Sequence, residues 1–272
     1  SKILIMPSVD EKINLEEDLF CARYELEILS GIVNYGMLER WVPGFCNPQT
    51  HKEHVYRYDW IKDFVRGKAV LDIACGTGYG SFKMAEDGGA ASVKARDIDQ
   101  RTVRYASIRN RHPRIGFDVA DAETISFENE FDIITSFETI EHLGRPEDLL
   151  RNANKALKPD GNFFVSTPIS PMQEDHEPLN KYHRTEWGFK RFQDLVAKHL
   201  SVSQVFLQLM SVPKKVDNGI PARLLRRSGL ARYPDTQIIE RLVPHKWNRE
   251  EVAEDSLGTL WAGYQILQCK KK

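Results

Sequence analysis

Three glycines at alternate positions, Gly76, Gly78 and Gly80, form the stretch of this 272-residue sequence with the clearest chemical meaning. They follow an apolar run that contains an acid, Asp72, and precede a helix-compatible segment at 81–86. Glycine adopts backbone conformations that are closed to residues with a Cβ, and it lets a ligand lie against the main chain. In a strand–turn–helix unit of a parallel sheet, such a turn lies at the edge where nucleotide-like ligands bind.

A second acid, Asp97, ends the next apolar segment and lies 21 positions after Gly76 (97 − 76). A carboxylate at this offset can accept hydrogen bonds from both hydroxyls of a ribose. Dinucleotide-binding turns usually have the pattern G-x-G-x-x-G and place a pyrophosphate on the helix N-terminus. Here the pattern is G-x-G-x-G after Asp72, whose carboxylate would repel a pyrophosphate and attract an ammonium group. S-adenosylmethionine has an ammonium and a sulfonium group and no phosphate, so the charges favour it over a dinucleotide.

The sequence resembles the class I S-adenosylmethionine-dependent methyltransferases over roughly residues 51–210 and the last strand. The resemblance rests on Asp97 and on four motifs in the order of that family: VLDIACGTGYGS, FDVADAETISF, FDIITSFETIEHL and LKPDGNFFVSTP. HVYRY, ETIEHL and Tyr182-His183 are similar to a bacterial group associated with surface-polysaccharide and other sugar pathways. The implied fold is α/β and Rossmann-like: a doubly wound, mostly parallel seven-stranded sheet with an antiparallel edge hairpin.

The pattern of the chain agrees with that fold. Strand and helix patterns alternate from Lys68 to Thr167, which predicts a parallel sheet with helices on both faces. Strands are predicted at 68–73, 91–97, 115–119, 131–136 and 161–167, and the resemblance adds two edge strands at 201–209 and 259–268. Helices are predicted within 15–40, with a break at Gly31 or Gly36, and at 54–65, 99–110, 146–157 and 185–199, the last capped by Thr185.

Four parts of the chain are expected to have different roles. They are an N-terminal helical lid or appendage at 1–50, the cofactor-binding core at 51–210, an insertion or substrate cap at 211–258, and the last strand of the core at 259–272. The N-terminal helix could equally be a packing helix or a dimer contact. The insertion contains a basic segment, 223–232, which could bind phosphates of a nucleotide-linked sugar or form a solvated helix face.

The resemblance implies where the cofactor binds. Asp72 and the glycine turn would hold its amino-acid end, Asp97 its ribose, and Asp121 its adenine amino group. Arg57 would pair with its carboxylate, the alternative being a surface arginine, and the alternative for Asp121 is a turn residue. The full set of expected cofactor-binding residues is Arg57, Asp72, Ala74, Gly76, Gly78, Tyr79, Asp97, Ile98, Asp121, Ala122 and Phe137.

Methyl transfer from a sulfonium requires an acceptor atom held near the methyl carbon and, for a protonated acceptor, a base. Glu138, Glu141 and His142 follow the fourth predicted strand, at the edge where the cofactor is expected. His142 can titrate near neutral pH, and Glu138 or Glu141 could orient it or contact the acceptor. His183, on the loop after the fifth strand and next to Tyr182, is the rival base. A structural role for His142 is the alternative. The other histidines have no metal-ligand spacing, and the sequence predicts no metal site.

Composition limits the classes of function. With 41% hydrophobic and 28% charged residues, the chain can bury a substantial core, and its net charge of −1 argues against a general nucleic-acid-binding protein. No apolar run reaches the roughly 20 residues needed to span a membrane, and the N-terminal apolar run is too short for a signal peptide. The four cysteines have no C-x-x-C spacing, so we expect reduced thiols in a cytoplasmic protein.

The predicted function is methyl transfer from S-adenosyl-L-methionine to a small-molecule acceptor, with S-adenosyl-L-homocysteine as the product. The favoured reaction is O-methylation of a sugar, a nucleotide-sugar or a surface-glycan precursor. One alternative is N-methylation of an amino sugar or another small amine, which needs less help from a base. Another is a non-catalytic scaffold subunit that binds the cofactor. The acceptor could be phosphate- or nucleotide-linked, and a homodimer is a further expectation.

Overall fold

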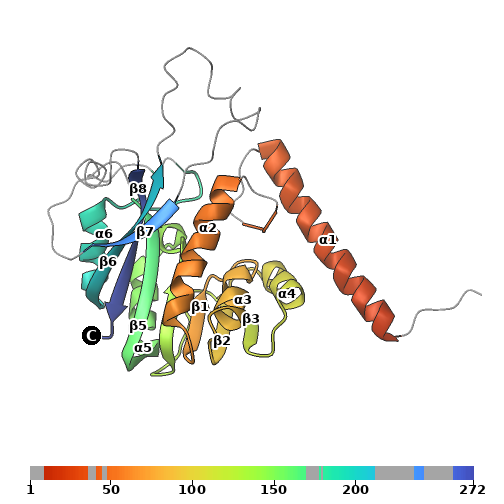
Figure 1. Ribbon diagram of the computed structural model, residues 1–272, viewed down its shortest axis with the longest axis horizontal. Helices are drawn as coiled ribbons and strands as arrows, with labels where there is room; N and C mark the ends of the chain where they lie inside the picture. The colour runs from red at the N-terminus through yellow and green to blue at the C-terminus, as the bar shows by residue number, and fades with distance from the viewer. Residues whose placement is uncertain are drawn as a thin grey trace, which may run out of the picture.

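Parallel strands form the centre of the computed structural model, which describes residues 9–35, 41–44, 48–169, 178, 180–211, 236–241 and 260–272. Figure 1 shows the twisted sheet with helices on both sides. The strand order is β3-β2-β1-β4-β5-β8-β6-β7. The strands are β1 (Ala69–Ile73), β2 (Ser92–Asp97), β3 (Ile115–Val119), β4 (Phe131–Ser136), β5 (Leu157–Pro168), β6 (Ser201–Ser211), β7 (Thr236–Arg241) and β8 (Leu260–Lys270).

Strands β1 to β5 are parallel to one another, and β8 runs antiparallel between β5 and β6. The carboxyl ends of the five parallel strands therefore lie at one edge of the sheet, as ligand-binding α/β folds require. The register pairs Asp72 of β1 with Thr135 of β4. The segment that leaves β4 consequently lies beside the glycine turn that leaves β1.

All seven predicted strands are present, and β6 and β8 form the expected antiparallel pair on the antiparallel side of the sheet, with β6 between β8 and β7 rather than at the outer edge. The structure adds an eighth strand, β7, which pairs with β6 and comes from the segment predicted as an insertion, 211–258. The stretch 158–161 contains Pro159 and Gly161, which are typical of a turn, but it falls within the bounds of β5, where the pairing with β4 shifts register. The basic segment 223–232 lies outside the described residues.

The helices are α1 (Val9–Tyr35), α2 (Pro48–Ile61), α3 (Tyr79–Glu86), α4 (Gln100–Arg109), α5 (Pro146–Ala156) and α6 (Phe189–Ala197), with short 3₁₀ helices η1 (Lys62–Phe64) and η2 (Ile140–His142). Helix α1 continues through Gly31, and α2 begins earlier than predicted, at a proline that suits a first helical turn. Asp99 caps α4 by accepting hydrogen bonds from the backbone N–H groups of Arg101 and Thr102. The predicted cap at Thr185 is wrong, because α6 begins after Gly188.

Alternate residues of β1 face opposite sides of the sheet and join two hydrophobic clusters. Leu71 and Ile73 pack in the cluster that includes α5 and α6, whereas Val70 packs with Ile61 of α2 and Met84 of α3. Burying one such side chain fully is worth about 1.5–3 kcal/mol, so each cluster holds its helices firmly on the sheet. The glycine turn lies between these two layers.

The N-terminal helix α1 packs on α4 and extends beyond the edge of the sheet (Figure 1). The rings of Tyr24 and Tyr105 stack with centroids 4.7 Å apart, and the hydroxyl groups of Tyr24 and Thr102 are 2.8 Å apart. Of the three described cysteines, Cys21 is buried at this contact, and none of the three forms a disulfide. None of the described helices has the length and apolar character that a membrane crossing needs.

Replacing Gly80 with alanine is expected to destabilise the chain. A Cβ at this position would lie 2.0 Å from the buried ring of Tyr58, so the ring or helix α3 must move. We expect a loss of about 1–3 kcal/mol in the free energy of unfolding, measured by urea denaturation, because overpacking outweighs the helix preference of alanine. Gly116→Ala is the matched control, since an added Cβ there meets no atom within 4 Å. Equal stability of Gly80→Ala and the parent would contradict this packing.

Candidate cofactor and acceptor site

The glycine turn has one packed side and one open side. Gly78 is in the left-handed conformation (φ 80°) at the start of α3, and a Cβ there would lie 2.7 Å from the ring of Phe117. Gly76 also has a positive φ, 55°, but a Cβ added to it would meet nothing within 4 Å. Ala74, before the turn, shares this conformation with φ 57°. A ligand can therefore approach the main chain at Gly76 directly.

Asp97 lies against the open side of this turn. Its Oδ2 accepts a hydrogen bond from the backbone N–H of Gly76 at 3.0 Å, and its Oδ1 accepts one from the N–H of Asp99 at 3.0 Å. The carboxylate is thus fixed at the end of β2, where the sequence offset predicts a ribose-binding acid. The next side chain, Ile98, is 65% exposed.

Asp121 and Ala122 follow β3 at the same edge. Val119, the last residue of β3, pairs with Asp97, and the N–H of Ala120 donates to the Asp97 carbonyl at 3.0 Å. Asp121 accepts a hydrogen bond at Oδ1 from the N–H of Glu123 at 2.8 Å, and Ala122 is buried. The structure therefore brings together the glycine turn, Asp97 as the candidate for ribose binding and Asp121 as the candidate for adenine binding. An open glycine turn flanked by acids fits S-adenosylmethionine, which needs close main-chain contact and hydroxyl-binding carboxylates.

Asp72 lies below the turn and is buried. Its Oδ2 accepts a hydrogen bond from the Ser81 hydroxyl at 2.6 Å, and its Oδ1 accepts one from Thr135 at 2.8 Å. Burial raises the pKa of Asp72 to about 6, the two hydroxyl groups lower it, and the charge of Asp97 raises it further. Through these two hydrogen bonds the Asp72 carboxylate links β1 to α3 and to β4, next to the glycine turn.

Aromatic side chains cover the start of α3. The Trp41 ring stacks on His54 with centroids 5.2 Å apart and meets Tyr79 edge-on at 4.9 Å. The Thr77 hydroxyl donates to the Trp41 carbonyl at 3.0 Å, which ties the segment after α1 to the glycine turn. Burial lowers the pKa of His54 to about 3, and the charges of Arg57 and His51 lower it further. His54 is therefore neutral at physiological pH.

Arg57 is buried on α2, in contrast to the surface alternative. Its Nε and one terminal nitrogen both donate to Oε1 of Gln208, at 3.0 and 2.9 Å, and its other terminal nitrogen lies 3.4 Å from Oε1 of Glu138. The guanidinium also lies 4.9 Å from the ring centroid of Tyr264 and 5.8 Å from that of Phe137. Arg57 thus holds Glu138 at the carboxyl end of β4.

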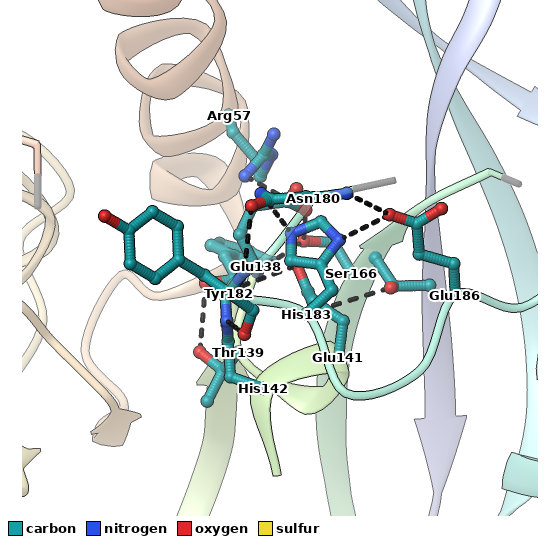
Figure 2. Close-up of polar contacts among 12 residues, drawn as sticks. Arg57, Glu138, Thr139, Glu141, His142, Ser166, Asn180, Tyr182, His183 and Glu186 are labelled. Carbon is teal, nitrogen blue, oxygen red and sulfur yellow. Dashed lines mark hydrogen bonds and ion pairs between the residues drawn. The ribbon is translucent and has the colours of Figure 1, made fainter. Parts of the chain in front are cut away.

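Glu138 has a strained backbone, with φ 52°. The Ser166 hydroxyl donates to its Oε1 at 2.6 Å, and its own N–H donates to the Ser166 oxygen at 3.1 Å. Positive φ is uncommon for a residue with a side chain and marks positions that the surrounding structure holds in place. Figure 2 shows Glu138 together with Arg57, Ser166 and the two candidate histidines.

The two rival bases lie next to each other. The rings of His142, on η2, and His183 meet edge-on with centroids 5.0 Å apart. His142 Nδ1 donates to the Tyr182 carbonyl at 3.0 Å, so the backbone rather than the phenol of Tyr182 contacts it. His183 Nδ1 donates to Oε1 of Glu186 at 2.9 Å, and the Asn180 amide donates to its Nε2 at 2.9 Å. Figure 2 shows this chain of contacts.

Glu141 connects the two histidine-bearing segments. Its carbonyl accepts hydrogen bonds from the N–H groups of Arg184 and Thr185, at 2.8 and 3.2 Å. Its side chain is buried, and Oε2 accepts a hydrogen bond from Thr167 at 3.3 Å. Burial first, and the charge of Glu138 second, raise the pKa of Glu141 well above its ordinary value.

Several residues of this site are absent from the predicted set. They are Glu53, Gln208 and Tyr264 around Arg57, and Asn180 and Glu186 around His183. Gln208 is the one with a sequence signal, because it is a polar residue inside the apolar strand VFLQLM. The others come from loops or from positions whose partners are distant in sequence.

The fold and the glycine-turn site together are typical of enzymes that bind S-adenosylmethionine. Comparison with known proteins supports this class. The family model described as a methyltransferase domain matches residues 64–210, more than half of the chain. The chain belongs to the class I S-adenosylmethionine-dependent methyltransferases, a family of enzymes. The cofactor that this membership implies is S-adenosyl-L-methionine.

The chain is similar to several characterised or described proteins over part of their length. A protein of Mycolicibacterium smegmatis described as an S-adenosylmethionine-dependent methyltransferase is 30% identical over 164 residues, 58% of this chain and 62% of that protein. A ubiquinone biosynthesis O-methyltransferase of Ralstonia nicotianae is 31% identical over 47% of this chain and 55% of its own. Phosphoethanolamine N-methyltransferase 1 of Triticum aestivum is 36% identical over 56% of this chain and 29% of its own. The chain thus spans less than two thirds of these relatives.

Solved structures share the fold. The [4+2]-cyclase SpnF aligns over 94% of this chain and 96% of its own, with a TM-score of 0.57 and 16% identity. An S-adenosylmethionine-dependent methyltransferase of Thermotoga maritima aligns over 82% and 90%, with a TM-score of 0.54 and 15% identity. Since one of these proteins is described as a cyclase, the fold by itself does not fix the reaction.

The raised pKa of Asp72 predicts a pH dependence of stability. Its ordinary value is 3.8 and its value in the folded chain is about 6, so the folded state binds this proton more tightly than the unfolded state does. The stability that the protonated form contributes is complete below pH 3.8 and is lost as the pH rises through about 6. The free energy of unfolding of the parent should fall between pH 4 and pH 7. This fall should be larger than that of Asp72→Asn by up to about 3 kcal/mol.

Urea denaturation at several pH values measures this difference. Asp63→Asn is the control, because Asp63 is exposed on η1 and its replacement should leave the pH dependence of the parent unchanged. Parallel stability curves for the parent and Asp72→Asn would show that Asp72 does not carry the effect.

Proposed function

We propose that this chain transfers the methyl group of S-adenosyl-L-methionine to a hydroxyl group of a small-molecule acceptor. The observation that supports this most is the adjacent pair of imidazoles, His142 and His183, at the edge where β4 ends beside the glycine turn. An oxygen acceptor must lose a proton during transfer, and two imidazoles offer proton acceptors near neutral pH. An amine that is already deprotonated needs no such group.

The proposed roles follow from the contacts. When bound, the cofactor would supply an electrophilic methyl group for the acceptor oxygen, and its sulfur would keep the electron pair of the broken C–S bond. His142 or His183 accepts the hydroxyl proton on Nε2, because Nδ1 of each ring donates to another group. Glu138, held by Arg57 and Ser166, orients the acceptor.

The cofactor-binding roles are proposed on the same basis. Asp97 accepts hydrogen bonds from the ribose, Asp121 from the adenine amino group, and the main chain at Gly76 and Gly78 lies along the amino-acid end. Ala74, Tyr79, Ile98, Ala122 and Phe137 line the bound cofactor. Arg57 acts through Glu138, because its guanidinium already has protein partners. Asp72 acts through the glycine turn, because its carboxylate accepts hydrogen bonds from Ser81 and Thr135.

The finer acceptor class that we propose is a sugar, a nucleotide-sugar or a surface-glycan precursor. Its support is the sequence: the HVYRY, ETIEHL and Tyr182-His183 motifs and the basic segment 223–232. Relatives named as an O-methyltransferase and as an N-methyltransferase both match this chain, so family membership leaves the acceptor atom open.

Cofactor binding is tested by calorimetric titration with S-adenosyl-L-homocysteine. We expect the parent to bind and Asp97→Ala to lose at least about 10-fold in affinity, because two charge-assisted hydrogen bonds to the ribose disappear. Asp118→Ala is the matched control, since Asp118 is exposed on β3 and pairs with Arg96. Equal affinities of Asp97→Ala and the parent would refute the assigned cofactor position.

The base assignment is tested with radiolabelled cofactor and a panel of nucleotide-sugars, other hydroxyl acceptors and small amines. Replacing His142 or His183 with asparagine should lower kcat on a hydroxyl acceptor by about 10²–10⁴-fold with unchanged affinity for S-adenosyl-L-homocysteine. His112→Asn, whose imidazole contacts Glu86 away from the site, should retain full activity. Full activity of the double histidine variant would favour an amine acceptor, and cofactor binding without transfer to any acceptor would favour a scaffold subunit.

A further inference from the structure

Three side chains at the acceptor edge could bind a single ion. Glu141, His142 and His183 each offer one ligand atom, and these atoms all lie within 4.8 Å of one another. Figure 2 shows that they come from two segments, η2 after β4 and the loop before α6. We propose that these three residues form a binding site for one divalent transition-metal cation. The site goes beyond the proposed methyl transfer and does not depend on it.

The first support is the orientation of the imidazoles. His142 donates its Nδ1 proton to the Tyr182 carbonyl and His183 donates its own to Glu186, which places the lone pair of each ring on Nε2. Histidines that bind metals in proteins are oriented in this way, with the second nitrogen donating to a carbonyl or a carboxylate. The Asn180 amide now donates to Nε2 of His183 and is the group that an ion would displace.

The second support is Glu141, and it is independent of the histidines. This carboxylate is 1% exposed, and its Oε1 has no hydrogen-bond partner among the described residues. Oε1 lies 4.0 Å from Nε2 of His142, too far for a hydrogen bond. Two ligands that each lie about 2.1 Å from one ion are about 3–4 Å apart, so this separation suits a shared cation.

Charge also favours a cation at this point. A buried carboxylate with one hydroxyl donor on Oε2 and no hydrogen-bond partner on Oε1 among the described residues is costly. Arg57 offsets this cost only in part, because the carboxylate that it contacts among the described residues is Glu138, at 3.4 Å. A divalent ion would supply the missing positive charge, and Glu141 would then bind it in the ionised form.

The donor set indicates which ion fits. Two imidazole nitrogens and one carboxylate oxygen suit Zn²⁺, Co²⁺ or Mn²⁺, whereas Mg²⁺ and Ca²⁺ prefer sites made of oxygens. Three protein ligands also leave positions open for a further oxygen ligand. One consequence rests on the proposed function. An acceptor hydroxyl bound to the ion at an open position would have a lowered pKa and would release its proton to solvent. The two histidines would then act as metal ligands rather than as bases.

The test titrates Co²⁺ into the untagged, metal-free 272-residue chain and follows visible absorption, with Zn²⁺ binding measured by calorimetry. We expect one Co²⁺ per chain, with d–d bands of a nitrogen- and oxygen-ligated ion. Glu141→Gln and His142→Asn should each weaken binding at least about 10-fold, because each variant removes one ligand atom.

The matched control is His199→Asn. It removes an imidazole that pairs with a carboxylate elsewhere, since His199 Nε2 lies 3.0 Å from Glu147, and it should leave Co²⁺ affinity unchanged. His183→Asn is the second ligand variant, and thermal unfolding checks that each variant is folded. Lack of Co²⁺ and Zn²⁺ binding by the parent, or parent-like affinity in the folded ligand variants, would overturn the site.

The two proposals fail in different ways. Binding of Co²⁺ that depends on Glu141 but without methyl transfer would support the metal site and overturn the proposed function. Full methyl transfer in excess EDTA by a protein that binds no metal would overturn the metal site and keep the function. Activity lost in EDTA and restored by Zn²⁺, Co²⁺ or Mn²⁺ would support both.

Discussion

The buried carboxylate of Asp72 is the constraint on which the rest of the site depends. It joins the end of β1 to α3 through Ser81 and to β4 through Thr135. An ionised carboxylate inside a protein is tolerated only with such donors, so the two hydroxyl groups are needed where they stand. Because Asp72 and Thr135 are also paired in the sheet, the glycine turn and the segment from Glu138 to His142 begin from one fixed point. Cofactor and acceptor candidates are thereby held at one edge.

The parts of the structure that depend on local pattern could be predicted from the sequence. Strand and helix alternation, the open turn at Gly76 and the position of Asp97 all follow from residue types and spacing. The contact between His142 and His183 could not, because it requires the loop after β5 to return to η2. That return depends on hydrogen bonds from Arg184 and Thr185 to the Glu141 carbonyl. The same bonds explain the wrong helix cap: Thr185 resembles a cap in sequence, but its N–H already has this partner.

Arg57 shows what a prediction based on resemblance leaves out, namely the protein partners of the side chain. The family pattern indicates a partner for the cofactor carboxylate, and the structure surrounds the guanidinium with Gln208, Glu138 and the ring of Tyr264. A buried guanidinium has five donors that need acceptors, which accounts for a glutamine inside the apolar strand β6. These partners come from β6, β8 and the end of β4, and no local sequence pattern relates them.

The two carboxylates after β4 differ in one physical respect that decides their chemistry. Glu138 has the charge of Arg57 beside it, whereas Glu141, three residues later, is buried with one hydroxyl donor and a carboxylate neighbour. Like charges in one site cannot both ionise easily, so Glu141 must either bind a proton or gain a cation. Two imidazoles with lone pairs directed by Tyr182 and Glu186 stand next to it. In the proposed metal site, proton binding and cation binding would compete for these three residues. The shared fold sets the cofactor edge, and we propose that this local competition sets how an acceptor is activated.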